Sequence, residues 1–559
     1  RGRLKSNFGA AFAFSVFWVD LSPIEVGKYW SFGKPYFCFV CCLMDMARGK
    51  TLSVVFKSNY QNQGMLLPPD LNDLISPTHP VRIVNEVIEK VDITSLLQQY
   101  KPGGTSSYHP RMLLKVLIYA YINNIYSSRK IEEAIGQNIC YMWLAGMSRP
   151  DHNTINRFRG QRLQKTLQPI FTQVVVLLCE EGLLSVNELY TDGTKIEANA
   201  NRYSFVWGNG IKYNREKIKT QLNELWQYAQ QVAASELDDT DPSGFDKIDS
   251  EKVSRTVEAI NAALKDKPVD KKVKQKLNYA KKHWPAALDK YEQQEKTMGG
   301  GRNSYSKTDP DATFMRMKED HMRNGQLKPA YNVQISTNNQ FIASYSVHQQ
   351  AGDTTTLIDH LTQHIKNFSK KPSNITADAG YGSEQNLQWL ETKRITAYVK
   401  HNQFDRNQSS LLKAKKPYSV DKLRYDEKKD LYYCPSGQPM KNIGSQTSTT
   451  RAGYVNTITR YQAKNCEGCP LRSECHQQKV NRIIEVNHNL NRLKQKVDKR
   501  LNSSRGIQKR KQRCYDTEPV FGNIKHNHHF KRFLLRGMEK VSVEMGLIAL
   551  AHNLRKKIA

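Results

Sequence analysis

Residues 374–382 read Asn-Ile-Thr-Ala-Asp-Ala-Gly-Tyr-Gly, and residues 189–195 read Leu-Tyr-Thr-Asp-Gly-Thr-Lys. Each stretch is a short apolar run that ends in an acidic residue, Asp378 in the first and Asp192 in the second. Short apolar runs bounded by glycine are typical of buried strands. We therefore expect two strands that each end in a carboxylate.

Further strand and helix signals lie around these two runs. The stretches 330–336 and 341–347 alternate as strands around a polar turn, which predicts a hairpin. A helix is expected over about 355–368, another from Ser383, and a short strand at 397–399. This order predicts an α+β fold with a mixed sheet flanked by helices.

The segment before the first strand is helical in pattern from about 80 to 160. Residues 146–151 have turn chemistry, and the next helix, 153–159, presents Arg157 and Arg159. A turn followed by a polar, basic helix resembles a DNA-reading module. A packed helical bundle with a solvated basic face fits the same pattern, and both interpretations stay open.

Two insertions interrupt the expected sheet. From 212 to about 284 the chain is charged and carries apolar stripes at helical spacing, which predicts a helical hairpin with its loop at 238–243 and no chemistry of its own. The second insertion holds four cysteines, Cys434, Cys466, Cys469 and Cys475. Tetrahedral zinc, with His476 as a substitute ligand, would staple an insert with little core of its own, whereas buried or redox-silent thiols are the alternative.

The net charge of the chain indicates which class of partner it binds. The 559 residues include 84 Lys and Arg against 53 Asp and Glu, a formal net charge of +31. Solubility needs only a modest net charge, so this excess favours a nucleic acid. The chain lacks an apolar run of the roughly 18 residues that a membrane helix needs, and a cysteine cluster of this kind indicates a reducing interior. We expect a cytoplasmic, nucleoid-associated protein without a membrane partner.

The first 49 residues do not fit this organisation. Basic residues precede an apolar run at 10–19 and superficially copy a signal peptide, but neither this run nor the one at 37–44 continues into the next segment. We expect residues 1–49 to be an upstream extension of the true protein and assign them no function.

A third acid completes the candidate site. Glu518 opens an amphipathic stretch that we expect to start a helix. Mg²⁺ prefers oxygen ligands and keeps several waters, so two or three carboxylates and substrate phosphates suit it. Gly193, and Gly380 after Asp378, should let a DNA phosphate approach the backbone closely.

The neighbourhoods of the three acids carry a resemblance. Residues 192–200, Asp-Gly-Thr-Lys-Ile-Glu-Ala-Asn-Ala, residues 377–382, Ala-Asp-Ala-Gly-Tyr-Gly, and residues 517–525, Thr-Glu-Pro-Val-Phe-Gly-Asn-Ile-Lys, resemble the catalytic blocks of bacterial insertion-sequence DDE transposases. Residues 533–537 and 551–554 match as well. The resemblance runs from about Val54 to the C-terminus.

The resemblance implies an RNase H-like core in which Asp192, Asp378 and Glu518 bind Mg²⁺ or Mn²⁺. It also implies a basic residue after the last acid, which would be Lys525, two helical turns along the same face. A related branch carries Tyr and Arg where this chain has Lys511 and Cys514, and Arg513 lies one residue from the expected position. We prefer a phosphate clamp over a solvated face for the basic residues of this region, Lys525, Arg513, Arg532 and Arg536.

The expected organisation follows from these assignments: an N-terminal DNA-binding domain at 50–165, core segments at 166–208 and 305–400, insertions at 209–304 and 401–504, and C-terminal core helices at 505–559. The expected function is that of a DNA transposase that binds terminal inverted repeats as a homodimer and performs two-metal cleavage and strand transfer. The alternatives are an RNase H-like nuclease without strand transfer and an inactive DNA-binding relic.

Overall fold

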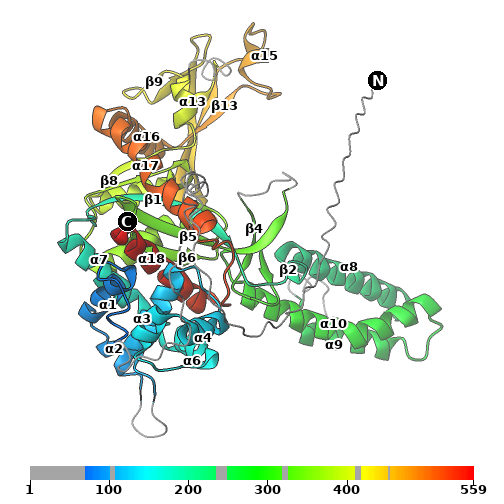
Figure 1. The fold of residues 1–559 in the computed structure, drawn as a ribbon. Coiled ribbons are helices and arrows are strands. Elements are labelled where there is room, and N and C mark those ends of the chain that lie inside the picture. The colour runs from blue at the N-terminus through cyan, green and yellow to red at the C-terminus, as the bar shows by residue number, and fades with distance from the viewer. Residues whose placement is uncertain (1–69, 101–106, 234–247, 318–324, 410–416, 451–452) are drawn as a thin grey trace, which may run out of the picture. The chain divides into compact units, whose positions relative to one another are not determined.

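The structure is a computed structural model that describes residues 70–100, 107–233, 248–317, 325–409, 417–450 and 453–559 (Figure 1). The expected upstream extension at 1–49 and the expected loop at 238–243 lie outside these residues. Everything described below belongs to one compact unit that starts at Pro69. No helix in these ranges is both long and apolar enough to cross a membrane.

A mixed sheet forms the centre of the described chain. Its strands follow the order β4-β5-β1-β7-β8, and β6, which is not in this series, also pairs with β5. β1 is antiparallel to β5 and parallel to β7, and β7 is parallel to β8. The strands are β1 (Glu188–Glu197), β4 (Thr313–Arg316), β5 (Leu327–Asn338), β6 (Phe341–His348), β7 (Asn374–Ala377) and β8 (Thr396–Val399).

The hairpin and the two late strands confirm the sequence prediction. The β5–β6 turn is tighter than expected: Asn339 and Gln340 both have positive φ, 51° and 62°, which is the backbone of a two-residue hairpin turn. One strand prediction is wrong, because β1 does not end at Asp192 but continues to Glu197. The antiparallel partner β5 supplies hydrogen bonds to this extension as far as Ala330, so the strand outlasts its apolar run.

Helices cover both faces of this sheet. On one face, His360 of α11 (Leu357–Phe368) bonds to Ser336 and Ser346 of β5 and β6. On the other face, α17 (Ser504–Gly522) crosses the sheet, and Lys509 reaches Tyr190 of β1. The remaining helices of this part are α12 (Glu384–Thr392), α16 (His488–Leu501) and α18 (Met538–Ile558), and the last packs against β6 (Figure 1). This α+β arrangement is consistent with an RNase H-like core.

The N-terminal helices share the hydrophobic core of the sheet. α3 and α7 pack on α18, and Phe171 of α7 meets the ring of Tyr345 edge-on at 5.0 Å. Polar contacts reinforce the junction: the Tyr126 hydroxyl donates to the His528 carbonyl at 2.6 Å. The helices are α1 (Pro80–Lys90), α2 (Thr94–Leu97), α3 (Pro110–Ile122), α4 (Ser128–Gln137), α5 (Ile139–Ala145), α6 (His152–Arg157), the π-helical η2 (Phe158–Arg162) and α7 (Leu167–Glu180).

The helical insertion has one more helix than the expected hairpin. In the described residues it consists of α8 (Gly208–Ala233), α9 (Ser250–Ala263) and α10 (Lys271–Met298), which pack pairwise around a core of their own (Figure 1). The second of the predicted apolar stripes belongs to α9. Residues 265–270 then connect α9 to α10. The short strands β2 (Phe205–Trp207) and β3 (Ser304–Ser306) pair at the base of the insertion.

The cysteine-bearing insertion is a small antiparallel sheet, and the prediction of little core is wrong. Its strands, in the order β13-β12-β11-β10-β9, enclose Tyr432, Met440 and Tyr461. Their bounds are β9 (Tyr425–Asp426), β10 (Leu431–Tyr433), β11 (Pro439–Thr449), β12 (Val455–Ala463) and β13 (Ile483–Val486), and the short helices are α13 (Phe404–Gln408), η7 (Val420–Lys422) and α15 (Arg472–Cys475).

Candidate active site

The two aspartates come from neighbouring positions of adjacent parallel strands. β1 and β7 pair in register up to Thr191 and Ala377, so Asp192 and Asp378 are the next residue on each. Asp192 is buried, and one carboxyl oxygen accepts the Gly193 N–H at 2.8 Å. Asp378 is half-buried and caps the turn η6 (Ala379–Tyr381) by accepting the Gly380 N–H at 2.9 Å.

A third aspartate that sequence reasoning missed braces this site. Asp353 lies in η5 (Asp353–Thr355), and one of its oxygens accepts the side-chain amides of Asn332 and Gln334 at 2.8 and 3.0 Å. The next residue, Thr354, donates its hydroxyl to the Gly380 carbonyl at 3.0 Å. The loop that carries Asp353 therefore holds the turn behind Asp378.

The glycines beside the two aspartates make room for protein groups. A Cβ at Gly193 would overlap the Gln334 amide and come within 2.8 Å of an Asp353 oxygen. A Cβ at Gly380 would lie 3.0 Å from an Asp378 oxygen and 3.6 Å from an Asp353 oxygen. The absence of a side chain at these positions is thus used to pack the carboxylates closely, whereas the sequence interpretation reserved the space for a phosphate.

Tyr381 is buried close to the three carboxylates. Its ring is fully buried and its hydroxyl donates to the Gln334 side-chain oxygen. Burial raises the pKa of Tyr381 well above its ordinary value, and the charges of Asp353, Asp192 and Asp378 raise it further. The three carboxylates therefore surround one buried group.

Arg513 supplies a positive charge to the cluster. It projects from α17, and its guanidinium lies 3.2 Å from the Asp192 carboxylate. The sequence interpretation assigned Arg513 to DNA, but in this structure its partner is a candidate metal ligand. One turn earlier on α17, Lys509 pairs with Glu188 at the start of β1. Both contacts fix α17 against the strand that carries Asp192.

Glu518 does not join the two aspartates in this structure. It lies within α17, four residues before the helix ends at Gly522, so the expectation that it starts a helix is wrong. The buried face of α17 is formed by Lys509, Asp516, Thr517 and Val520, whereas Glu518 is exposed. Among the described residues it has no hydrogen-bond or ion-pair partner. α17 packs through one face only, and Glu518 lies outside that face.

The expected DNA contacts divide into exposed and buried side chains. Arg157 is exposed, but Arg159 is 3% exposed and donates to the Tyr126 carbonyl at 2.6 Å and the Tyr121 hydroxyl at 3.1 Å. Arg159 is therefore a structural residue of the N-terminal helices, and its assignment to DNA is wrong. The reason is the change at Phe158 from α-helix to π-helix, which turns the chain away from a continuous exposed face.

The basic residues after Glu518 are also held by the protein. Lys525 is buried in a second π-helical segment, η8 (Asn523–Asn527), so it does not continue the face of α17 as expected. Arg532 and Arg536 are exposed, yet each donates to a backbone carbonyl of the segment after β1: Arg532 to Ala198 at 3.1 Å and Arg536 to Asn199 at 2.7 Å.

The side chains at the candidate site fit a divalent cation only in part. Two adjacent carboxylates, Asp192 and Asp378, suit a hard divalent cation that keeps water and substrate ligands. In the ranges that the structure describes, however, no group of three or more His, Cys, Asp or Glu side chains is arranged to hold a metal. The aspartate pair thus fits Mg²⁺ as a partial site, and the third protein ligand is not in position.

The four cysteines of the second insertion are free thiols. Cys466 accepts the Arg482 backbone N–H at 3.3 Å, and Cys475 accepts the Arg482 guanidinium at 2.9 Å. A hydrogen bond from Ser436 and one from the Leu471 N–H lower the pKa of Cys469. The structure does not gather the four thiols into a metal-binding group, so structural zinc stays a prediction.

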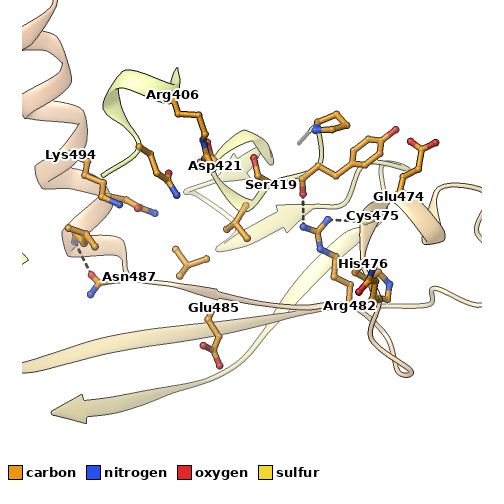
Figure 2. Close-up of a pocket in the computed structure, with 18 of the residues that line it drawn as sticks. Arg406, Ser419, Asp421, Glu474, Cys475, His476, Arg482, Glu485, Asn487 and Lys494 are labelled. Carbon is orange, nitrogen blue, oxygen red and sulfur yellow. Dashed lines mark hydrogen bonds and ion pairs between the residues drawn. The ribbon is translucent and has the colours of Figure 1, made fainter. Parts of the chain in front are cut away.

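Arg482 also lines a cavity of about 750 Å³ between the small sheet and α16 (Figure 2). The labelled wall in Figure 2 mixes bases and acids: Arg406, Lys494 and Arg482 alternate with Asp421, Glu474 and Glu485. Burial lowers the pKa of Lys494. Because neither sign of charge dominates, we assign no ligand to this cavity.

Two protein families match this chain. The family described as Transposase DDE domain matches residues 433–558, and the family described as Transposase domain (DUF772) matches residues 69–161. The first range contains the cysteine insertion, α17 and Glu518, and the second contains α1 to α6; Asp192 and Asp378 lie outside both. Neither the curated proteins nor the solved structures contain a match. Both matched families are transposase families, and together they support an insertion-sequence DDE transposase.

Proposed function

We propose that this transposase binds the terminal inverted repeats of an insertion sequence and performs divalent-metal-dependent DNA cleavage followed by strand transfer. One observation carries the proposal: Asp192 and Asp378 follow the last paired residues of two adjacent parallel strands. Two carboxylates at adjacent positions suit a hard divalent cation that keeps water and phosphate ligands. The net charge of +31 supports a polyanionic substrate at this edge.

In this proposal Asp192 and Asp378 hold Mg²⁺ or Mn²⁺ together with water and phosphate oxygens. A bound pair of divalent cations supplies activation of the attacking water or 3′-hydroxyl and stabilisation of the leaving oxygen. Arg513 balances the charge of Asp192 before a cation binds, at 3.2 Å. Asp353 is a positioning residue, because it bonds to Asn332 and Gln334 while its loop fixes the turn behind Asp378.

Glu518 is the third ligand in this proposal, as the resemblance implies. α17 contacts β1 through Arg513. For Glu518 to reach the two aspartates, α17 would have to shift when DNA and metal bind. The support is the exposure of Glu518 without a partner in the described chain, which leaves its carboxylate available.

DNA contacts in this proposal use the exposed basic residues Arg157, Arg532 and Arg536, which would position the phosphate backbone. A homodimer would hold the two ends of the element at once, since each active site processes one end. Arg159 and Lys525 are left out of this set because both are buried.

The test is an end-cleavage assay with the full chain, Mg²⁺ and DNA from the flanks of the gene. Cleavage followed by joining to a target duplex is the expected result. Cleavage without joining would replace the proposal by a nuclease, and binding without cleavage would replace it by an inactive relic. Retention of full cleavage by Asp378→Asn would overturn the metal-site assignment.

A further inference from the structure

The first half of α10 carries a concentration of lysines unlike the rest of the helical insertion. From Lys271 to Leu288 this helix contains no acidic residue, and the first acid is Asp289. Over the same stretch it has lysines at 271, 272, 274, 276, 281 and 282. All of them except Lys276 are exposed.

Several basic side chains of the insertion meet acids. Arg215 pairs with Glu295 at 2.8 Å and Lys276 with Glu224 at 2.7 Å. Lys296 pairs with Glu292 at 2.8 Å in the last turns of α10. In the described part of the chain, the side chains of Lys271, Lys272, Lys274, Lys281 and Lys282 have no ion pair. We call these five residues the α10 lysine row.

The row is electrostatically unfavourable for the helix itself. Three of its members lie in the first turn of α10, where the helix dipole disfavours cations. Like charges at Lys271 and Lys274, three residues apart, add to this repulsion. A face that only needs to be soluble works well with interspersed acids and bases. A polyanionic partner would relieve the repulsion that this face retains.

The lysine row occupies the part of α10 that is not packed against the insertion. Leu277, Ala280, Trp284 and Leu288 bury one side of α10 against α8 and α9, and at 3.6 residues per turn the five lysines spread over about the remaining half of its circumference. From Lys271 to Lys282 the row extends about 17 Å at the rise of an α-helix. Duplex DNA carries about one negative charge per 1.7 Å of its axis, so a row of this length faces several phosphates. Tyr279, 58% exposed, lies among these lysines, and its ring centroid is 4.6 Å from that of His283 with the two rings tilted.

We infer that the helical insertion binds duplex DNA through the α10 lysine row, which contacts the phosphate backbone without reading its sequence. This inference rests on the proposed function in one respect, that DNA is the substrate. It gives a role in substrate binding to an insertion that the sequence interpretation left without chemistry of its own.

The experiment measures DNA binding by the full chain as a function of salt. In the row variant, Lys271, Lys272, Lys281 and Lys282 are each changed to Gln. The matched control changes four lysines that have ion-pair partners, Lys90, Lys276, Lys296 and Lys496, to Gln. Both variants lower the net charge by four. The probe is a short duplex of mixed sequence, titrated between about 50 and 200 mM salt, where each lost phosphate contact changes the slope of log K against log salt by about 0.9.

We expect the row variant to reduce this slope by about 2–4, while the control stays within about 1 of the unchanged protein. A second variant, Lys281→Gln with Lys282→Gln, leaves the first turn intact and should reduce the slope by about half as much. Far-UV circular dichroism should match in all proteins.

Equal slopes in the row and control variants would overturn the inference. Loss of binding to polyglutamate without loss of binding to DNA would also overturn it, because that result indicates an acidic protein partner. If the unchanged protein cleaves DNA but the row variant binds like the control, only this inference fails; if the unchanged protein neither binds nor cleaves DNA, the proposed function fails.

Discussion

The two aspartates and the glutamate of the candidate site are held in different ways. Asp192 and Asp378 follow paired residues of adjacent strands, so backbone hydrogen bonds set their separation. Glu518 lies on α17, which contacts the sheet only through side chains on one face, and Glu518 is outside that face. The backbone pairing fixes the first two acids in the free protein, whereas the third depends on how a helix packs.

This difference explains why one half of the site is assembled and the other is not. A one-residue slip of a strand would move its side chains to the opposite face, so strand register is strongly specified. A helix that packs only through side chains can rotate or shift at a smaller cost in free energy. Such shifts of about 1–2 Å are common in conformational switching. We therefore expect the two aspartates to bind a metal ion before DNA binds, and Glu518 to join them as a ligand only afterwards.

The largest effect should come from comparing Asp378→Asn with Glu518→Gln. Both substitutions should lower DNA cleavage by about 10³-fold, because a metal ligand is worth several kcal/mol of transition-state stabilisation. They should differ in the free protein. Asp378→Asn should abolish Mn²⁺ binding measured by electron paramagnetic resonance without DNA, and Glu518→Gln should leave it unchanged.

Asp73→Asn, which changes an exposed acid of the N-terminal segment, serves as the control and should keep both cleavage and Mn²⁺ binding. If Glu518→Gln weakened Mn²⁺ binding as much as Asp378→Asn does, the glutamate would already belong to the site in the free protein. The contrast between strand-held and helix-held acids would then be wrong.

A smaller effect is expected at Asp353, which supports the strand-held half of the site. Asp353→Asn should lower cleavage by about 10- to 100-fold, in the range of groups that orient metal ligands. The reason is that the Asn oxygen is uncharged, so it accepts from the amides of Asn332 and Gln334 more weakly than the carboxylate does. A positioning role predicts a loss of kcat at an unchanged number of bound Mn²⁺ ions. Loss of one bound ion would instead make Asp353 a direct ligand.

Several parts of this comparison could be predicted from the sequence. The strand at 374–377, the hairpin and the helices around 357–368 and 384–392 are confirmed, because local apolar patterns and caps specify them. Asp353 was missed because it follows a polar turn, Gln-Gln-Ala-Gly-Asp, with no apolar run to mark it. Its importance arises from the close approach of Gly193 and Gly380, which only the folded chain reveals.

The errors share a physical cause. The burial of Arg159 and Lys525 follows from two π-helical segments, η2 and η8, and a period fixed at 3.6 residues cannot anticipate them. The exposed position of Glu518 depends on which face of α17 packs on the sheet, and that choice is tertiary. The continuation of β1 past Asp192 depends on its partner β5, which is distant in the sequence.

The anchoring of α17 can be tested along the helix itself with a matched pair of glycines. A Cβ at Gly506 would overlap the Arg500 carbonyl oxygen, whereas a Cβ at Gly522 would meet nothing within 4 Å. Gly506→Ala should therefore lower the free energy of unfolding by about 1–3 kcal/mol through overpacking. Gly522→Ala should leave it unchanged or raise it by up to about 1 kcal/mol. Urea unfolding of both proteins checks this, and equal losses would mean that both ends of α17 are held with equal rigidity.

A last contrast compares the two faces of the sheet by pH. The face opposite α17 buries His364, whose pKa burial lowers to about 4, and His360, whose pKa burial also lowers. In the unfolded chain these histidines bind a proton near their ordinary value of about 6.5, so below it the unfolded state takes up protons that the folded state does not. Burial of the two neutral rings therefore costs no stability above pH 6.5, and stability falls below it; for His364 the loss is about 1 kcal/mol per pH unit as the pH drops towards 4.

Unfolding midpoints in urea at pH 7.5 and pH 5 would measure this loss. His364→Asn should remove part of the pH dependence, because asparagine binds no proton in this range, while the exposed His526→Asn should not change it. The other face relies on the Lys509–Glu188 and Arg513–Asp192 pairs. A pH dependence that persisted unchanged in His364→Asn but disappeared in Glu188→Gln would locate the acid-sensitive contacts on the α17 face instead.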